Sequence, residues 1–484
     1  LQILIIKIQY LKSTNLIIER EIKRARMSIV ELKFPQFKLE GENINDILIN
    51  ARSRTIAWGA CAKANYLSAS EAECFKKVSD YGDVKGRVAL ILKNPDVYAK
   101  NIASLLTKDT QSDIIRFVLV SMIDTLVLKG TEFAKSVLAL SHLDTSLPYE
   151  PLVKLLGSKD EGIRLCAAYV LTLLLTDEAA AKQGNEKHIG PLYVYIASKL
   201  LSSGSMDYKF AGVQLLKELL QVKEYREIYW SQQKILFPPL FKILVEREGE
   251  LQMKYYTALS VWLLTFIEQA VIDLNEDYPS IIEVLYSISK DAVKEKIVRL
   301  AIDSLLNLLN FSDPVKKEQV VKHYLLASGL EITKQLLERK WADSELKDDL
   351  NTMLEILNEA VTTLTTFDEY TNELNTKTFV WSPSHKSEEF WYENIDEFKK
   401  NDWKLLKHIV ALLSEKTDDL KRLYQNQTIV CSDIGQMIKQ APETARALDK
   451  IGGKAIIMNL MNSPNSNVKY EALRTTQQLV ALSL

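Results

Sequence analysis

Glycine and proline are scarce in this chain of 484 residues, with 16 and 12 copies respectively. Tight turns between β-strands depend on these residue types, so their scarcity disfavours sheet-rich folds and favours long helices. Hydrophobic residues make up 47% of the chain and charged residues 26%, as in a folded soluble protein. The length is sufficient for one extended core or two to three compact ones.

Neither sign of charge is in excess, because the formal net charge is −2. The chain therefore lacks the basic field that binds nucleic acid or an anionic membrane, and we expect no nucleic-acid partner. No apolar run reaches about 18 residues, so we expect no direct membrane insertion. The four cysteines form no C-x-x-C pair, which disfavours disulfides and favours a reducing compartment. The sequons at Asn310 and Asn426 are then expected to be chance matches.

Motifs that support catalysis are also missing. The sequence contains no G-x-x-x-x-G-K-[ST] phosphate loop, no G-x-S-x-G and no H-E-x-x-H. The five histidines include no pair at i, i+4, and only His385, within Ser-Pro-Ser-His-Lys, has an unusual setting. We therefore expect no enzymatic activity, no cofactor and no metal site.

A repeated triplet of apolar, basic and bulky residues is present instead, each at the start of an apolar stretch. The first five basic residues of the series are 48, 45, 45 and 45 residues apart. The triplets are Ile115-Arg116-Phe117, Ile163-Arg164-Leu165, Tyr208-Lys209-Phe210, Met253-Lys254-Tyr255, Val298-Arg299-Leu300 and Val468-Lys469-Tyr470. A period of roughly 40 to 47 residues is typical of armadillo and HEAT repeats, whose stacked helices share one core. The pattern predicts an all-α, armadillo/HEAT-like right-handed helical solenoid.

Residues around the triplets indicate how the repeats pack. Small residues such as Ala168 and Gly212 are predicted to let neighbouring helices approach closely. Pro151, Pro191 and Pro238-Pro239 are predicted to lie in the first turn of the helix before a triplet helix, where proline is tolerated. The basic residue of each triplet is expected to bond carbonyls at the end of the preceding helix, where the dipole favours a cation. A basic ladder that binds an acidic partner is the alternative.

The beginning of the chain differs from the repeats. Residues 1–26 precede the first methionine, Met27, and no signal-peptide cleavage site follows, so we interpret them as translated upstream sequence. We assign 1–43 to a leader that is disordered, or non-native before Met27, and expect helix from Ile44 with a break near Arg52–Arg54. These arginines could bind an anion, although a solvated helix face is the simpler interpretation.

The repeats are interrupted where threonines, aromatic residues and a proline gather. β-Branched threonines weaken helices, and Pro383 disfavours helical backbone at Ser382. We predict a short hinge made of Thr362, Thr363, Leu364, Thr365 and Thr366. The hinge separates an N-terminal superhelix, 44–361, from a smaller C-terminal helical-repeat domain, 367–484. An ordinary loop whose aromatic residues fill the core is the simpler alternative.

Several stretches resemble the H subunits of eukaryotic vacuolar (V-type) proton ATPases, and the fungal members of that family in particular. The most specific are FDEYTNEL with WSPSHKSEEFWYENIDEFKK at 367–400, and LDKIGGKAIIMNLMNSPNSNVKYEAL at 448–473. ARSRTIAW at 51–58 and MKYYTALSVWLLTF at 253–266 add to the resemblance, which extends from residue 44 to the end of the chain.

The resemblance implies a non-catalytic regulatory component of a proton pump, acting in the cytoplasm on the cytosolic face of the vacuolar or endosomal membrane. Family members bridge the ATP-hydrolysing sector and the membrane sector and are required for coupled activity. The N-terminal domain is thought to hold a peripheral stalk made of the E and G subunits, and the C-terminal domain reaches the membrane sector at its a subunit. When the sectors separate, the C-terminal domain turns toward the B subunit of the catalytic head and the central rotor, and blocks ATP hydrolysis.

The resemblance also implies two sets of functional residues in the C-terminal domain. The polar run 414–427 matches the position of an inhibitory loop, although it is a few residues shorter here, and a solvated connector is an equal alternative for any single residue. Candidate inhibitory contacts are Ser414, Glu415, Lys416, Thr417, Asp418, Asp419, Lys421 and Arg422. Candidate interface residues in the 367–400 motif are Phe367, Asp368, Tyr370, Trp381, Pro383, His385, Phe390 and Trp391.

Without the resemblance, the default function of such a solenoid is an armadillo-type cargo or trafficking adaptor that binds extended peptides. That function predicts tryptophan and asparagine side chains at one position of successive repeats. The seven tryptophans do not recur at a fixed step, and no matching asparagine ladder is present, which disfavours it. An extended peptide, either the chain's own N-terminal residues or a segment of a partner, could still lie in the N-terminal groove.

Overall fold

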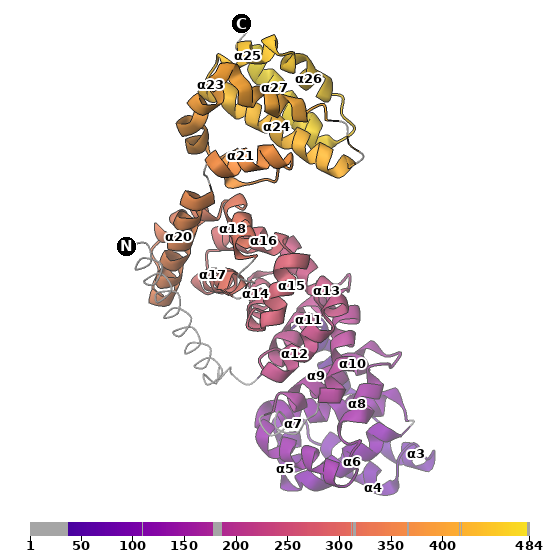
Figure 1. Cartoon of the computed structure of the whole chain (residues 1–484). Helices are drawn as coiled ribbons and strands as arrows, with labels where there is room; N and C mark the ends of the chain where they lie inside the picture. The colour runs from indigo at the N-terminus through magenta and orange to yellow at the C-terminus, as the bar shows by residue number, and fades with distance from the viewer. Residues whose placement is uncertain are drawn as a thin grey trace. The chain divides into compact units, whose positions relative to one another are not determined.

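The chain folds as packed α-helices, and its described residues contain no β-strand (Figure 1). The computed structural model describes residues 37–481 with the exception of 109, 178–185, 311, 313–315, 365–366, 416 and 418. The chain divides after Tyr225, within α12 (Lys223–Ser231), into two compact units. The predicted all-α, armadillo/HEAT-like fold class is confirmed.

The first unit consists of stacked helices in which α7 and α9 pack against each other and α11 packs on α9 and η2. Its helices are α2 (Glu42–Ser53), α3 (Trp58–Lys63), α4 (Ala69–Ser79), α5 (Val84–Lys93), α6 (Pro95–Thr107), α7 (Ser112–Leu138), η1 (Ala139–His142), α8 (Tyr149–Leu155), α9 (Glu161–Leu175), α10 (Glu186–Tyr195), η2 (Ile196–Leu201) and α11 (Met206–Leu219). The helix predicted from Ile44 begins two residues earlier and ends at Ser53, at the expected break.

In the second unit, α17 packs between α14 and α20, and α24 packs against both α23 and α27. Its remaining helices are α13 (Gln233–Glu246), α14 (Leu251–Leu264), α15 (Glu268–Asp277), α16 (Ser280–Asp291), α17 (Glu295–Asn310), α18 (Lys317–Leu326), α19 (Gly329–Leu337), α20 (Ser344–Leu364), α21 (Phe367–Thr376), α22 (Pro383–Lys386), α23 (Glu388–Leu412), α24 (Leu420–Gln440), α25 (Thr444–Lys450), α26 (Gly453–Leu460) and α27 (Ser466–Ala481). Non-helical backbone at Lys400–Trp403 breaks α23.

None of the helices in the described ranges is by itself long and apolar enough to cross a membrane. One pair, α14 with α15, meets the length and composition criteria only when the two helices are taken together, and they are bent by 112° at their break. Many residues of α14 are buried within the protein, including Val261 and Leu264 at 0% exposure.

Each of the six triplets lies within the first six residues of a helix, namely α7, α9, α11, α14, α17 and α27, so the prediction that they begin helices is confirmed. Most of their apolar residues are buried, as Leu165 in α9 and Val298 in α17 illustrate at 0% exposure, whereas Tyr470 in α27 is 65% exposed. Gly212 confirms the predicted close approach of helices, because a Cβ atom there would lie 2.8 Å from Cβ of Leu200. The missing side chain thus lets α11 pack directly against η2.

The prediction that prolines lie in the first helical turn is correct only for Pro151, the third residue of α8. Pro191 lies inside α10, and Pro238-Pro239 lie inside α13. A proline at such a position removes a backbone hydrogen bond of the helix. Fully buried neighbours such as Leu192 and Phe237 show that tertiary packing outweighs this local cost.

Ion pairs link consecutive repeats at a constant separation of 44 residues. The pairs are Arg116–Asp160, Arg247–Asp291 and Arg299–Asp343. The expected bond from a triplet cation to a carbonyl is found for Arg164, whose Nη1 donates to the carbonyl of Ser158 at 2.7 Å. It is wrong for Arg116 and Arg299, because their guanidinium groups pair instead with carboxylates of the next repeat. Part of the basic ladder is therefore occupied by the chain's own acids.

The predicted hinge falls between α20 and α21. Thr362, Thr363 and Leu364 have helical backbone as the last residues of α20, so the helix-weak threonines do not end this helix earlier. Thr365 and Thr366 lie outside the described residues, and α21 begins at Phe367. The hinge and the domain limits derived from it remain predictions.

Candidate functional site

The aromatic motif that follows α20 forms a core among the C-terminal helices. The ring of Tyr370 lies at its centre, with ring centroids 5.3 to 5.7 Å from those of Phe379, Phe390, Trp391 and Phe398. All five side chains are at most 2% exposed. Aromatic pairs at these distances stabilise a core beyond the burial of their area. The simpler alternative, in which these aromatic residues fill the core, describes them well.

Most of the candidate interface residues in this motif are buried. The buried ones are Tyr370, Pro383, His385, Phe390 and Trp391. Phe367 and Trp381 are half-buried, and the side chain of Asp368 lies outside the described residues. A buried side chain does not touch a partner in this conformation, so among the candidates whose side chains are described, Phe367 and Trp381 are the ones placed for a direct contact.

His385 is completely buried and lies between two carboxylates. Its Nδ1 is 2.9 Å from both carboxylate oxygens of Asp433 on α24, and its Nε2 is 2.9 Å from Oε2 of Glu373 on α21. The hydroxyl of Tyr370 donates to Oδ2 of Asp433 at 2.9 Å. We call these four residues the His385 cluster. It joins α21, α22 and α24 through side chains that are distant in sequence.

The two carboxylates favour the protonated form of His385. Burial by itself lowers the pKa of His385, but the charges and hydrogen bonds of Asp433 and Glu373 outweigh it and raise the pKa to about 9. Burial raises the pKa of Asp433, an effect that the charge of His385 opposes. At neutral pH the cluster therefore contains an imidazolium with both ring N–H groups donating to carboxylates. It is a structural ion pair rather than a group open to substrate.

The loop between α23 and α24 contains the candidate inhibitory contacts. Several of these residues form ion pairs or hydrogen bonds within the protein that stabilise the loop. Glu415 lies 3.9 Å from Nζ of Lys377 and 3.7 Å from Nη2 of Arg422. The hydroxyl of Thr417 accepts from Nη2 of Arg422 at 3.2 Å. Asp419 caps α24, because its carboxylate accepts from the backbone N–H of Arg422 at 3.0 Å. These residues fix the loop rather than project from it.

Other residues of this loop face solvent. Ser414 and Lys421 are exposed, and Lys416 and Asp418 lie outside the described residues. Leu420, at the first position of α24, is 56% exposed although it is not in the predicted set. A lone leucine inside the polar run 414–427 is the signal that points to it. A partner that binds this loop would contact Leu420 and Lys421 before the residues that brace it.

Residues 37–41, which we call the strap, lie extended across α9 and α11 of the first unit. The backbone N–H of Leu39 donates to the hydroxyl of Tyr169 at 2.9 Å, and Leu39 is only 1% exposed. The amide of Gln214 binds the backbone of Glu40 twice, accepting from its N–H at 3.0 Å and donating to its carbonyl at 2.7 Å. A segment of the chain itself therefore occupies these side chains.

The strap ends at a glycine that no other residue can replace without strain. Gly41 has a φ of +147°, and a Cβ atom there would lie 2.6 Å from Oδ1 of Asp207. The carboxylate of Asp207 accepts from the backbone N–H groups of Glu42 at 3.1 Å and Asn43 at 2.6 Å, and so satisfies the start of α2. Residues 37–43, part of the predicted leader, are thus integrated into the first unit.

We expect Gln214→Ala to release the strap at a cost of about 1–2 kcal/mol, because both hydrogen bonds between its amide and the backbone of Glu40 are lost. Hydrogen exchange of the Leu39 and Glu40 amides should accelerate roughly tenfold. Gln221→Ala is the matched control, since the Gln221 amide donates to the side chain of Glu218 instead. An unchanged hydrogen-exchange rate in Gln214→Ala would show that the side chain of Gln214 does not hold the strap.

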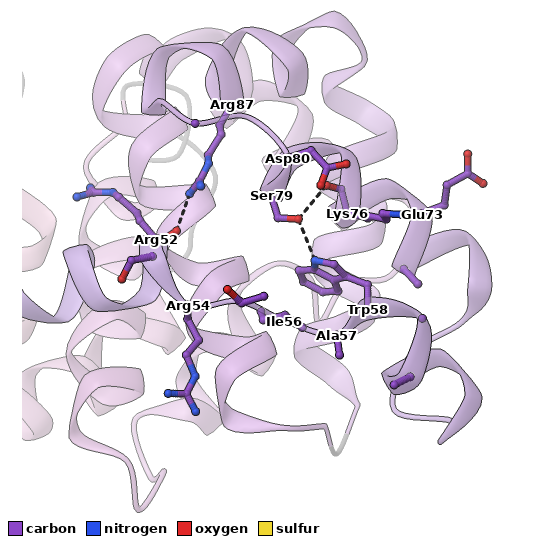
Figure 2. A pocket seen from close by; sticks show the side chains of 16 residues that line it. Arg52, Arg54, Ile56, Ala57, Trp58, Glu73, Lys76, Ser79, Asp80 and Arg87 are labelled. Atoms are coloured by element: carbon purple, nitrogen blue, oxygen red, sulfur yellow. Dashed lines mark hydrogen bonds between the residues drawn. The ribbon is translucent and has the colours of Figure 1, made fainter.

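A pocket of about 770 Å³ opens between the C-terminus of α2 and helices α3 and α4 (Figure 2). The indole N–H of Trp58 donates to Oγ of Ser79 at 3.0 Å on one side. On the other side Arg87 extends toward the backbone of Arg52, and its Nη1 donates to that carbonyl at 3.2 Å. The guanidinium of Arg52 itself donates through Nε to Asp124 at 3.0 Å.

Both arginines of the predicted anion site already have acidic partners. Arg54 pairs with Asp113 at 3.0 Å, and Arg52 pairs with Asp124, whose side chain is only 8% exposed. An incoming anion would compete with these carboxylates. Within the described ranges, no group of three or more His, Cys, Asp or Glu residues is placed to hold a metal ion. The two arginines at this pocket are therefore already paired within the protein.

Two family models together match nearly all of the chain that the structure describes. The model for the N-terminal part of the V-ATPase H subunit matches residues 42–357, and the model for its C-terminal part matches residues 363–483. The chain belongs to the family of V-ATPase H subunits. The predicted resemblance to V-ATPase H subunits is thereby confirmed at the level of the family.

Relatives from animals, an amoeba and a plant support this membership. The H subunit of the V-type proton ATPase of Drosophila melanogaster is 27% identical over 440 residues, which cover 89% of this chain and 88% of that protein. Its counterpart in Dictyostelium discoideum is 22% identical and covers 88% and 92%. The probable H subunit of Oryza sativa subsp. japonica is 24% identical and covers 88% and 94%. The similarity of this chain to these H subunits thus spans most of each relative.

Similar solved structures include engineered proteins. A designed armadillo repeat protein is 15% identical with a TM-score of 0.40, covering 53% of this chain and 98% of its own. Another engineered protein is 17% identical with a TM-score of 0.42, covering 94% and 98%.

Proposed function

We propose that this chain is a non-catalytic regulatory component of the vacuolar proton-pumping ATPase. It bridges the ATP-hydrolysing sector and the membrane sector, is required for coupled activity, and inhibits ATP hydrolysis by the detached sector. The observation that supports this role is membership of the V-ATPase H family across both residues 42–357 and 363–483.

The two arrays have separate partners in this proposal. The N-terminal array, 44–361, binds the E and G subunits of the peripheral stalk. The C-terminal array, 367–484, binds the a subunit of the membrane sector in the assembled pump, and the B subunit with the central rotor after the sectors separate. The protein acts in the cytoplasm, on the cytosolic face of the vacuolar or endosomal membrane. The two family models leave residues 358–362 between them, so a hinge at 362–366 would lie at the start of the part that the second model matches.

Inhibition of this kind requires a tether and no chemistry. A rotary motor stops when a fixed part is tied to a moving part, and a short hinge lets one rigid array choose between two docked poses according to the competing interfaces. The loop between α23 and α24 suits such a contact. It is braced from inside by Glu415 and Arg422, while Leu420 and Lys421 are exposed.

The direct test is MgATP hydrolysis by a detached vacuolar ATPase sector that lacks its own H subunit, measured with and without this protein. Dose-dependent inhibition with one-to-one binding is the expected result. An absence of both binding and inhibition would overturn the proposal. The adaptor alternative would then be tested by a pull-down with residues 44–361.

Replacing 414–422 with a Gly/Ser linker would test the role of the loop. That replacement also removes the internal bonds of Glu415, Asp419 and Arg422, so substitutions at exposed positions alone are a more specific test. We expect the double variant Leu420→Ser, Lys421→Glu to raise the concentration for half-inhibition roughly tenfold. It changes two exposed side chains and keeps the internal contacts of Glu415 and Arg422. The measurement is a titration of the detached sector's MgATP hydrolysis.

The matched control makes the same changes on an exposed part of α27. Lys469 and Leu473 are both exposed, so Leu473→Ser with Lys469→Glu changes polarity and charge equally at another surface. This control should inhibit like the parent. Equal potency of both double variants would place the inhibitory contact elsewhere.

A further inference from the structure

α22 is a helix of four residues that contacts helices on both sides of the junction between α20 and α21. It packs against α18 and α20, which precede the junction, and against α24, which follows it. Its residues Pro383, Ser384 and His385 are all buried. So small an element has little stability of its own, and its place depends on its neighbours.

The C-terminal helices hold α22 tightly. His385 donates to Glu373 on α21 and to Asp433 on α24. The segment that leads into α22 is also attached to α24, because the amide of Asn426 accepts from the N–H of Phe379 at 3.0 Å and donates to the carbonyl of Lys377 at 2.9 Å. α22 is therefore attached to the C-terminal helices and connects them to α18 and α20 by its contacts with these two helices.

A second contact spans the same junction beside α22. Nζ of Lys322 on α18 lies 2.6 Å from Oε1 of Glu369 on α21. Their side chains are 23% and 19% exposed, so solvent screens this pair less than it screens a fully exposed one. The pair thus favours the arrangement in which α21 lies against α18.

We propose that α22 and the Lys322–Glu369 ion pair form a latch that holds the C-terminal helices α21–α27 in one docked pose on α18 and α20. The latch involves one very short helix and one ion pair, whereas α24 packs along both α23 and α27. Small contacts between domains permit relative motion, so the latch can open while the C-terminal helices stay folded. This inference goes beyond the proposed function, because it describes an equilibrium of the isolated chain without the ATPase.

The test measures the distance between two spin labels in the full-length chain. Glu355 on α20 and Glu393 on α23 are exposed and serve as label sites after replacement by cysteine. Cys74 is replaced by serine, since the other three cysteines are buried. We expect the parent to give one dominant distance, and Lys322→Glu and Glu369→Lys each to increase the population at other distances roughly tenfold. The exchanged pair, with both substitutions, should restore the parental distribution.

Lys334→Glu is the matched control, because it makes the same charge change at an exposed position of the neighbouring α19. It should leave the distances unchanged. Hydrogen exchange of the α24 amides should also stay unchanged in Lys322→Glu, which separates an open latch from an unfolded domain. Parental distances in both single variants, failure of the exchanged pair to restore them, or loss of α24 protection would each overturn the latch. None of these results depends on inhibition of the ATPase.

Discussion

Replacing His385 with alanine should destabilise the C-terminal helices by about 3–5 kcal/mol, the usual cost of breaking a buried ion pair from one side. Asp433 is completely buried and would lose its cationic partner, while the side chain of Glu373 is only 14% exposed. The loss should appear as faster hydrogen exchange across α24 and as a lower urea midpoint for the unfolding of this region.

His408→Ala is the matched control for this prediction. His408 lies on α23 in the same group of helices but is exposed, so its removal should change stability by no more than about 0.5 kcal/mol. The double variant His385→Ala with Asp433→Asn should recover part of the loss, because it removes the unpaired buried charge. Equal stability of His385→Ala and His408→Ala would refute a stabilising role for the cluster.

The same cluster predicts a dependence on pH, with a definite sign. The pKa of His385 rises from 6.5 to about 9 in the folded protein, so the folded state binds this proton more tightly than the unfolded state. The stabilisation is complete below pH 6.5 and is lost as the pH rises to about 9, in total about 3 kcal/mol. Protection of α24, corrected for intrinsic exchange, should fall across this range in the parent. It should vary less in His385→Ala.

The second large effect is expected at Asn426, whose side chain is 0% exposed. Asn426→Ala removes both hydrogen bonds that Asn426 makes to the segment before α22, and leaves the N–H of Phe379 and the carbonyl of Lys377 without this partner. We expect a loss of about 2–4 kcal/mol, since unpaired buried polar groups are costly. Urea unfolding and hydrogen exchange of the Phe379 amide measure it.

Gln425→Ala provides the comparison, because the neighbouring amide of Gln425 makes a single bond to the carbonyl of Phe379, at 2.9 Å, from a half-buried position. Its expected cost is about 1 kcal/mol. If the two variants lose the same stability, burial of Asn426 does not matter. The burial of Asn426 also agrees with the view that its sequon is a chance match.

The fold class could be predicted because stacked repeats bury equivalent apolar helices at a nearly constant interval in the sequence. An apolar triplet helix must be buried in every repeat, so the period of about 45 residues is visible in the sequence. Gly212 could be predicted for a similar reason, since a small residue on a buried helix face indicates close packing. The predicted start of α2 was accurate to two residues, because the apolar positions from Ile44 onward mark this helix.

The His385 cluster could be predicted only in part. His385 has an unusual sequence context, but its partner Asp433 lies 48 residues further along, in a stretch that reads simply as helix. Which carboxylate meets the imidazole depends on how α24 packs against α21 and α22, and no local pattern encodes this. The strap had no signal either, because Gln214 and Glu40 are 174 residues apart.

Proline positions were predicted from local preference alone, and this is why they were partly wrong. Proline is disfavoured inside a helix, as at Pro191 and Pro238, because it lacks the backbone N–H that donates to the preceding turn. Their neighbours Leu192 and Phe237 are fully buried, and the packing energy of such side chains exceeds the loss of one backbone bond. The local preference of proline therefore marks these positions as unusual, but it does not determine whether the helix continues through them.

The ion pairs at a separation of 44 residues have a consequence for how such an array can change its length. Arg116 meets Asp160 and Arg299 meets Asp343, so in these two repeats the cation of the triplet pairs with an acid of the next repeat. Inserting part of a repeat between the two partners would move the carboxylate away from its arginine. Inserting or deleting a whole repeat of about 45 residues would preserve such a pair only where the repeat that then follows also has an acid at the matching position.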